Sequence, residues 1–222
     1  MTWLIEAEPR PFDCDLNTTA LVMIDMQRDF LEPGGFGESL GNDVLSLKPV
    51  VAVCEELLQL TRKLGLTVIH TREGHMPDLS DVPSTKLELN PLGQRIGDIG
   101  PLGRILIRGE PGNQFTPDLA PLPSEQIIEK SGKGAFSGTG FAHILKSKGI
   151  KSLLVAGVTT EVCVHSTVRE ASDRGFDCLV IADACGSYFP EFHHSALKMI
   201  SSQGGIFGKV SCFSQVIRSL DV

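Results

Sequence analysis

The chain has 222 residues, of which 41% are hydrophobic, and its formal net charge is −7 at pH 7. This length predicts one domain with a sizeable core, and the acidic balance argues against nucleic acid and acidic membrane surfaces as main partners. No stretch approaches the ~18 apolar residues of a membrane-spanning helix, and no basic, apolar leader is visible, so we expect a cytoplasmic protein.

Short apolar runs alternate with amphipathic segments along most of the chain. A continuous apolar run predicts a strand covered on both faces, and apolar residues three or four apart predict a helix packed on one side. A polar lead-in over 1–18 comes first. Strands are then expected over 19–24, 66–70, 104–107, 126–129, 151–156, 176–182 and 209–212. Helices are expected over 49–64, 139–149 and 190–203, from Thr159 or Thr160 to the residue before Gly175, and in a short final segment capped by Ser214. This alternation predicts an α/β fold with a doubly wound, mostly parallel sheet of about six strands and helices on both faces.

The span 76–125 breaks the alternation, because Gly and Pro are frequent there and regular patterns are weak. A stretch this long without clear elements is unusual inside a compact domain. We therefore expect an irregular insertion that forms a pocket wall or a subunit contact.

The turn after the 151–156 strand carries a local signal for chemistry. It reads Gly157-Val158-Thr159-Thr160-Glu161-Val162-Cys163-Val164, which places Cys163 in the first turn of a helix. Free backbone N–H groups and the positive end of the helix dipole favour a thiolate there and can hold an oxyanion. The alternative is that Cys163 is a small buried hydrophobic residue, as many free cysteines are.

Asp25, Lys130 and Cys163 each lie just beyond the carboxyl end of an expected strand. In a parallel sheet these ends share one edge, so the three side chains can converge. An acid can take the proton of the thiol, a thiolate attacks carbonyl carbon, and an ammonium group lowers the pKa of the thiol. Taken singly, Asp25 also fits a structural cap, and Lys130 fits a solvated strand end.

Two other segments suggest binding. The loop Ser131–Gly138 superficially resembles a phosphate loop, although no Ser or Thr follows its Gly-Lys pair and Ser137 stands where a dinucleotide loop has its third glycine. A metabolite-binding module without catalysis is therefore the alternative from another functional class. His70, Glu73 and His75 could form a metal site, but their spacing fits no standard zinc pattern, and we expect neither a metal nor an organic cofactor.

Three longer motifs resemble those of the isochorismatase-like cysteine hydrolases. They are residues 20–30 around the first strand, Lys130 with Ala135, Phe136 and Thr139, and residues 157–164. The resemblance covers nearly the whole chain, which predicts a single domain over 1–222. It implies a catalytic triad of Asp25, Lys130 and Cys163. It also implies a non-proline cis peptide at Val158–Thr159 that aims the N–H groups of Thr159 and Cys163 into an oxyanion hole.

A finer resemblance, over 71–81, 103–112 and 199–208, is to the branch that contains biuret hydrolase, triuret hydrolase and ureidoacrylate amidohydrolase. It implies a homo-oligomer, expected to be a tetramer, that cleaves a C–N bond of a small ureido or amide compound of biuret or triuret type through a covalent cysteine intermediate. In biuret-type members a Gln at the position of Gln203 contacts the substrate, and we expect Gln203 and Phe30 to position it. A same-fold hydrolase of another carboxamide, a ureidoacrylate or a vinyl ether is the alternative.

The sequence departs from the family pattern at two places. Residues 131–134 replace a linker that more commonly contains proline, and Gly140 stands where many members have Asp. Both departures affect the expected mouth of the pocket and leave the triad intact. The roles of Arg72, Glu73, His75 and Lys133 stay open at this stage.

Overall fold

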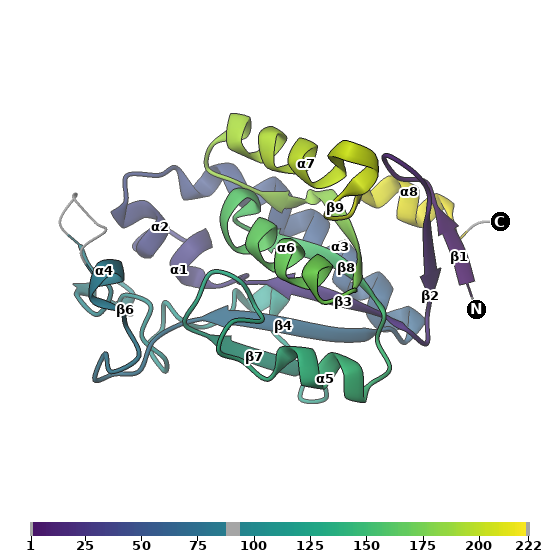
Figure 1. The fold of residues 1–222 in the computed structure, drawn as a ribbon. Helices are drawn as coiled ribbons and strands as arrows, with labels where there is room; N and C mark the ends of the chain where they lie inside the picture. The colour runs from purple at the N-terminus through teal and green to yellow at the C-terminus, as the bar shows by residue number, and fades with distance from the viewer. Residues whose placement is uncertain (1, 88–93, 221–222) are drawn as a thin grey trace.

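The structure is a computed structural model that describes residues 2–87 and 94–220 (Figure 1). A six-stranded sheet runs through its centre in the order β10-β9-β8-β3-β4-β7, and each neighbouring pair of strands is parallel. The strands are β1 (Thr2–Ile5), β2 (Phe12–Asp15), β3 (Thr19–Ile24), β4 (Thr67–Glu73), β5 (Ile99–Gly100), β6 (Gly103–Arg104), β7 (Gln126–Lys130), β8 (Ser152–Val158), β9 (Asp177–Gly186) and β10 (Lys209–Ser211). The helices are α1 (Arg28–Leu31), α2 (Phe36–Ser39), α3 (Lys48–Leu64), α4 (Ser84–Leu87), α5 (Phe141–Ser147), α6 (His165–Asp173), α7 (Pro190–Gly205) and α8 (Phe213–Arg218), with 3-10 turns over Val44–Leu47 and Pro117–Leu119 and a π-helical turn over Thr160–Val164.

Helices cover both faces of the sheet because successive side chains of each buried strand point to opposite sides. In β3, Leu21 and Met23 pack in one core with α3 and α8. Ala20, Val22 and Ile24 pack in the other core with α5, α6 and α7 (Figure 1). The expected doubly wound α/β fold is therefore confirmed.

Several element boundaries differ from those expected. The polar lead-in over 1–18 contains a hairpin of the short strands β1 and β2, which lies beside α8 at one end of the molecule (Figure 1). Strand β4 continues to Glu73 and β9 to Gly186, so residues that seemed to follow these strands belong to them. The final helix begins at Phe213 with Cys212 as its cap, and Ser214 lies inside it.

Within 76–125, where residues 88–93 lie outside the described part, the described residues form the short elements α4, β5 and β6 and the 3-10 turn over Pro117–Leu119. The expected strand over 104–107 is wrong, because Gly103 and Arg104 pair with the two residues of β5 while Ile107 makes only an isolated bridge to His75. Ile105, Leu106 and Ile107 instead form a small buried cluster with Ile96. In the described residues, no helix is long and apolar enough to cross a membrane.

Candidate active site

Four buried polar side chains meet at the carboxyl ends of β3, β4, β7 and β8. Lys130 Nζ lies 2.7 Å from Asp25 Oδ2, 3.4 Å from Glu73 Oε2 and 3.6 Å from Cys163 Sγ. Asp25 and Glu73 are fully buried, and Lys130 and Cys163 are 1% and 4% exposed. The structure thus brings together the three residues that the sequence placed at one sheet edge, and it adds Glu73.

Asp25 is held in place by its own backbone geometry and by the neighbouring strand. It has a φ of +51°, in the left-handed region that Asp tolerates better than most side chains. Its N–H group donates to the Thr71 hydroxyl at 3.2 Å, and that hydroxyl donates to Asp25 Oδ1 at 2.6 Å. The remaining oxygen, Oδ2, is left for Lys130.

The segment before Cys163 approaches β3 very closely. A Cβ on Gly157, whose φ is +124°, would lie 2.1 Å from the Ile24 carbonyl oxygen, so only glycine fits there. The peptide bond between Val158 and Thr159 is cis, as expected. Thr159 has an extended backbone and precedes a π-helical turn that contains Cys163, where an α-helical turn was expected.

The surroundings of Cys163 oppose the thiolate that its place at the start of a helix favours. Burial raises its pKa well above the usual value, Lys130 lowers it, and the negative charges of Asp25 and Glu73 raise it again. The helix terminus alone therefore does not decide the protonation state. Cys163 Sγ instead donates a hydrogen bond to Glu73 Oε2 at 3.4 Å.

Glu73 lies at the centre of the charge network. Its Oε1 atom lies 2.8 Å from both Lys86 Nζ and Lys133 Nζ. Burial alone would raise the pKa of Glu73, but the ammonium groups of Lys130, Lys133 and Lys86 hold it well below its usual range. The sequence suggested Glu73 only as a possible metal ligand and gave it no part in catalysis, because the expected strand stopped three residues before it.

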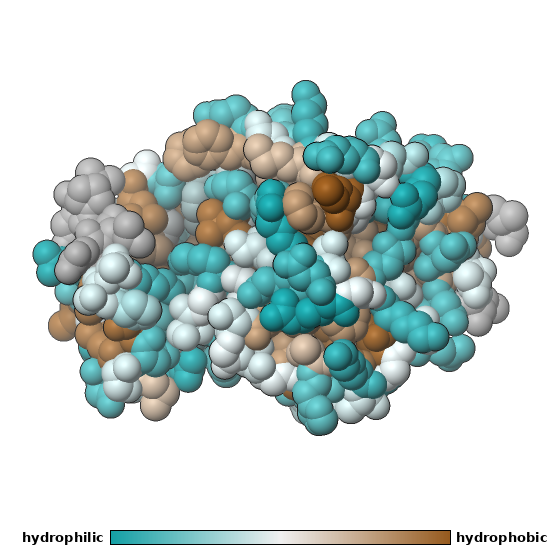
Figure 2. Space-filling view, in the orientation of Figure 1, coloured by the Kyte–Doolittle hydropathy of each residue, from teal (hydrophilic) through white to brown (hydrophobic). Residues whose placement is uncertain are grey.

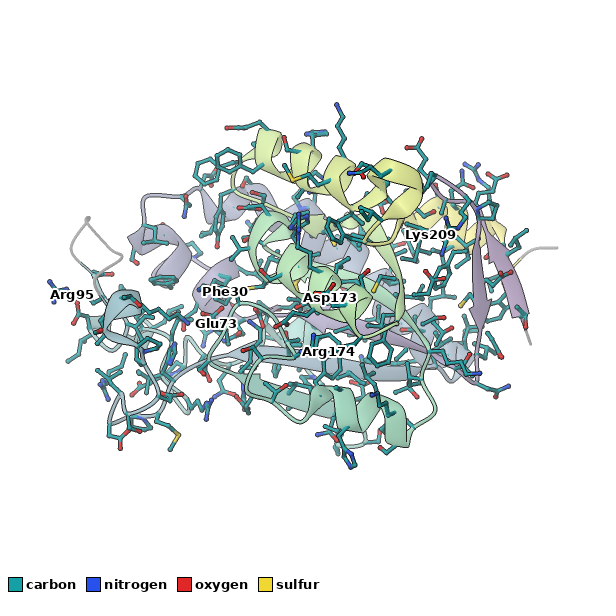
Figure 3. All side chains as sticks on the ribbon, in the orientation of Figure 1. Phe30, Glu73, Arg95, Asp173, Arg174 and Lys209 are labelled. Atoms are coloured by element: carbon teal, nitrogen blue, oxygen red, sulfur yellow. The ribbon has the colours of Figure 1, made fainter. Side chains whose placement is uncertain are left out.

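A pocket of about 320 Å³ opens above these residues. Cys163, Glu73, Thr159 and Lys133 line it, together with mostly apolar side chains that include Phe30. Figure 3 labels Phe30 and Glu73, which both line this pocket. This is the arrangement expected of a binding site for small molecules, which is concave, mostly apolar and has a few convergent polar groups.

The description "Isochorismatase domain" belongs to the family model that matches residues 19–212 of this chain. The chain belongs to the isochorismatase family. It is accordingly a hydrolase of that family, as the three motifs indicated.

Relatives and solved structures agree with this assignment. The isochorismatase-family chain is 27% identical to the ureidoacrylate amidohydrolase RutB of Azorhizobium caulinodans, over 97% of this chain and 96% of the relative. It is 29% identical to RutB of Pseudomonas syringae pv. syringae, over 86% and 80% of the two chains. An isochorismatase family protein from Desulfovibrio vulgaris superposes with a TM-score of 0.76 at 27% identity, covering 93% of this chain and 100% of that one.

Gln203 does not belong to the pocket of the isochorismatase domain. It is exposed at the far end of α7, where residues 202–204 leave helical geometry, and it is not among the residues that line the pocket. The neighbouring carbonyl of Gly204 accepts a hydrogen bond from Arg10 of the N-terminal hairpin at 2.7 Å. The expectation that Gln203 positions substrate is therefore wrong for the pocket of a single chain.

The loop over 131–138 is tied to α6 rather than open to a phosphate. The amides of Ala135 and Phe136 donate to Thr167 Oγ1 and Glu170 Oε2 at 3.1 and 3.0 Å. Lys133 of the same loop points to Glu73. These contacts occupy two backbone N–H groups and the lysine of the loop, which the metabolite-binding alternative needs for its ligand.

The candidate metal ligands are arranged differently from the expected His70, Glu73 and His75 set. His70 pairs with Glu125 at 3.0 Å, while His75 contacts Lys86. Asp25, Glu73 and Cys163 each place one ligand atom within 4.8 Å of the others. The ammonium group of Lys130, which contacts all three, supplies the positive charge that their burial requires.

Proposed function

We propose that this hydrolase is a cysteine amidohydrolase, which cleaves a C–N bond of a small ureido or amide compound of biuret or triuret type. One observation carries the proposal: the Cys163 thiol lies at the pocket wall beside a buried Asp25–Lys130 ion pair. The ureidoacrylate amidohydrolases among the relatives support amide hydrolysis, and they make a ureidoacrylate the second candidate substrate.

In the first step, Asp25 accepts the proton of the Cys163 thiol, and the thiolate sulfur attacks the carbonyl carbon of the substrate. Asp25 is a better acceptor than Glu73, because three ammonium groups stabilise the Glu73 carboxylate whereas Lys130 alone pairs with Asp25. The ammonium group of Lys130 stabilises the negative charge that stays between Asp25 and the sulfur.

The carbonyl electron pair then moves to oxygen, and the oxyanion accepts hydrogen bonds from the N–H groups of Thr159 and Cys163. As the carbonyl re-forms, the C–N bond breaks and the amine or ammonia leaves with the proton from Asp25. Water, deprotonated by Asp25, attacks the thioester or thiocarbamate, and Cys163 departs and regains its proton. Phe30, at the pocket wall, packs against the flat substrate. No cofactor takes part in these steps.

The experiment is an ammonia-release assay with biuret, triuret and a ureidoacrylate, each with the parent protein and with Cys163→Ser. Turnover of at least one compound by the parent, with loss of about 10³-fold or more in the variant, is expected if the thiol is the nucleophile. Trapping of a substrate adduct on Cys163 by mass spectrometry would identify the covalent intermediate. Turnover that survives in Cys163→Ser would contradict the mechanism, and the ranking of the three compounds separates the two substrate candidates.

The same proposal covers the setting of the enzyme. We infer a homo-oligomer, expected to be a tetramer, that works in the cytoplasm on a freely diffusing small molecule and binds neither nucleic acid nor membranes. The surface carries charged and polar residues between separate apolar patches, as Figure 2 shows for one face. Sedimentation analysis of the purified protein tests the oligomeric state.

A further inference from the structure

Glu73 makes more charged contacts than any mechanism with a three-residue triad requires. One of its oxygens lies 2.8 Å from Lys86 Nζ and from Lys133 Nζ, and the other lies 3.4 Å from Lys130 Nζ and from Cys163 Sγ. The carboxylate is fully buried, so water does not screen these interactions. A single group therefore links the nucleophile to three cations.

The main chain of Glu73 is fixed independently of the lysines. Gln27 Oε1 accepts a hydrogen bond from the N–H group of Glu73 at 2.7 Å, and Gln27 Nε2 donates to its carbonyl oxygen at 2.8 Å. Asn113 Nδ2 donates to the same carbonyl, also at 2.8 Å. Both amide side chains are fully buried, so the end of β4 is held rigidly under the pocket.

The contacts around Glu73 also set the charge beside the nucleophile. Three ammonium groups and two carboxylates are linked to one another, so one positive charge is unbalanced while Cys163 is a thiol. Without Glu73 two positive charges would be unbalanced. The charged or titratable side chains that contact Cys163 or line the pocket with it are Asp25, Glu73, Lys86, Arg95, Lys130, Lys133, Glu161 and Tyr188.

We propose that Glu73 is a fourth functional residue of this site, which holds Lys130, Lys133 and Lys86 in place and keeps Cys163 a thiol until substrate binds. This assignment deepens the proposed function and rests on Cys163 as the nucleophile. A carboxylate at 3.4 Å disfavours a negative sulfur, which protects the nucleophile from premature reaction. The lysines that it holds then stabilise the charge that develops on the bound substrate.

The test is Glu73→Gln, which keeps the shape of the side chain and removes its charge. Alkylation of Cys163 by iodoacetamide is followed against pH, with the rate of Cys163→Ser subtracted to remove the other cysteines. Because the variant loses a negative charge beside the sulfur, alkylation at pH 7 should become about tenfold faster or more, with its midpoint moved to lower pH. Turnover should fall by about tenfold or more, because Lys130 and Lys133 lose their anchor. The alkylation result needs no substrate, so it stands whether or not the proposed function does.

Glu129→Gln is the matched control. Glu129 lies one residue before Lys130 on the neighbouring strand β7 and pairs with Arg72, outside the pocket. Its alkylation profile and turnover should stay within about twofold of the parent, since this pair is partly exposed and Glu129 contacts neither Cys163 nor the three lysines around Glu73. A change as large as that of Glu73→Gln would show a general effect of losing an ion pair and would overturn the proposal.

A second variant distinguishes charge from misfolding. Glu73→Gln combined with Lys86→Met restores the single unbalanced positive charge, so the alkylation midpoint should return towards that of the parent. If Glu73→Gln alone does not fold, Glu73→Asp replaces it, and the proposal then requires reduced turnover with a parent-like alkylation profile. Parent-like turnover in Glu73→Asp, unchanged alkylation in Glu73→Gln, or no return in the double variant would each refute the role assigned to Glu73.

Discussion

Replacement of Lys130 by Met should destabilise the fold strongly near neutral pH. Lys130 is the ion-pair partner of Asp25 at 2.7 Å, and both side chains are fully buried, whereas Glu73 retains Lys86 and Lys133. Removal of one partner of a buried pair costs about 3–5 kcal/mol. Because 1 kcal/mol changes the Tm of a domain of this size by roughly 2–4 °C, we expect Tm to fall by about 6–20 °C.

The loss should depend on pH with a definite sign. The pKa of Glu73 is lower in the folded protein than in the unfolded chain, so its contribution to stability is present above the unfolded pKa and is lost as pH falls towards the folded one. Lys130 supplies part of this contribution, and it also balances Asp25. The unfolded pKa of a glutamate lies near 4.5, so this contribution is complete at about pH 6 and partly lost at about pH 3. The difference in Tm between parent and variant should therefore be larger at about pH 6 than at about pH 3.

Thermal unfolding of both proteins at the two pH values measures this effect. Lys209→Met is the control, because Lys209 pairs with Asp177, whose side chain is 46% exposed and keeps water as a partner. Its loss should be smaller, at most about 1 kcal/mol, and similar at both pH values. An equal deficit for Lys130→Met at both pH values, or one no larger than that of the control, would refute the reasoning.

Three further predictions concern the groups around this pair. Asp25→Asn should stay folded and lose about 10²- to 10⁴-fold in kcat, because the amide cannot accept the thiol proton; a steady-state assay with parent-like kcat would contradict this. Gly157→Ala should lower Tm or abolish folding, since the added Cβ would lie 2.1 Å from the Ile24 carbonyl oxygen. Calorimetry measures the change in Tm, and Gly175→Ala is the control, because Gly175 also has a positive φ but no atom within 4 Å of an added Cβ. Gln27→Leu should cost about 1–3 kcal/mol in denaturant unfolding, because it leaves a buried N–H group of Glu73 without its acceptor; an unchanged midpoint would count against the fixing of Glu73.

The central sheet was predictable because its strands are covered on both faces. Thr19–Ile24 is buried at every position and appears in the sequence as an uninterrupted apolar run bounded by polar residues. The β1–β2 hairpin was missed for the opposite reason. Its strands have four residues each and lie within a polar, proline-containing segment, so their alternation of positions is too short to distinguish them from a loop.

The candidate site was predictable where its residues directly follow buried strands. Asp25, Lys130 and Cys163 could be placed on one sheet edge from chain order alone, because parallel strands share a direction. Gln203 could not be placed, since its position depends on how far α7 runs from the pocket and on where that helix loses its geometry.

The class of fold, the family and the three residues that could form a nucleophilic centre were all readable from the amino-acid sequence. Local patterns suffice for this, because apolar runs and strand ends are encoded by neighbouring residues. The tertiary structure decided that Glu73 contacts Cys163 and three lysines from α4, β7 and the following loop. It also decided the surroundings of Cys163, where burial and two carboxylates raise the pKa of the thiol and Lys130 lowers it, because these groups come from residues far apart in the chain.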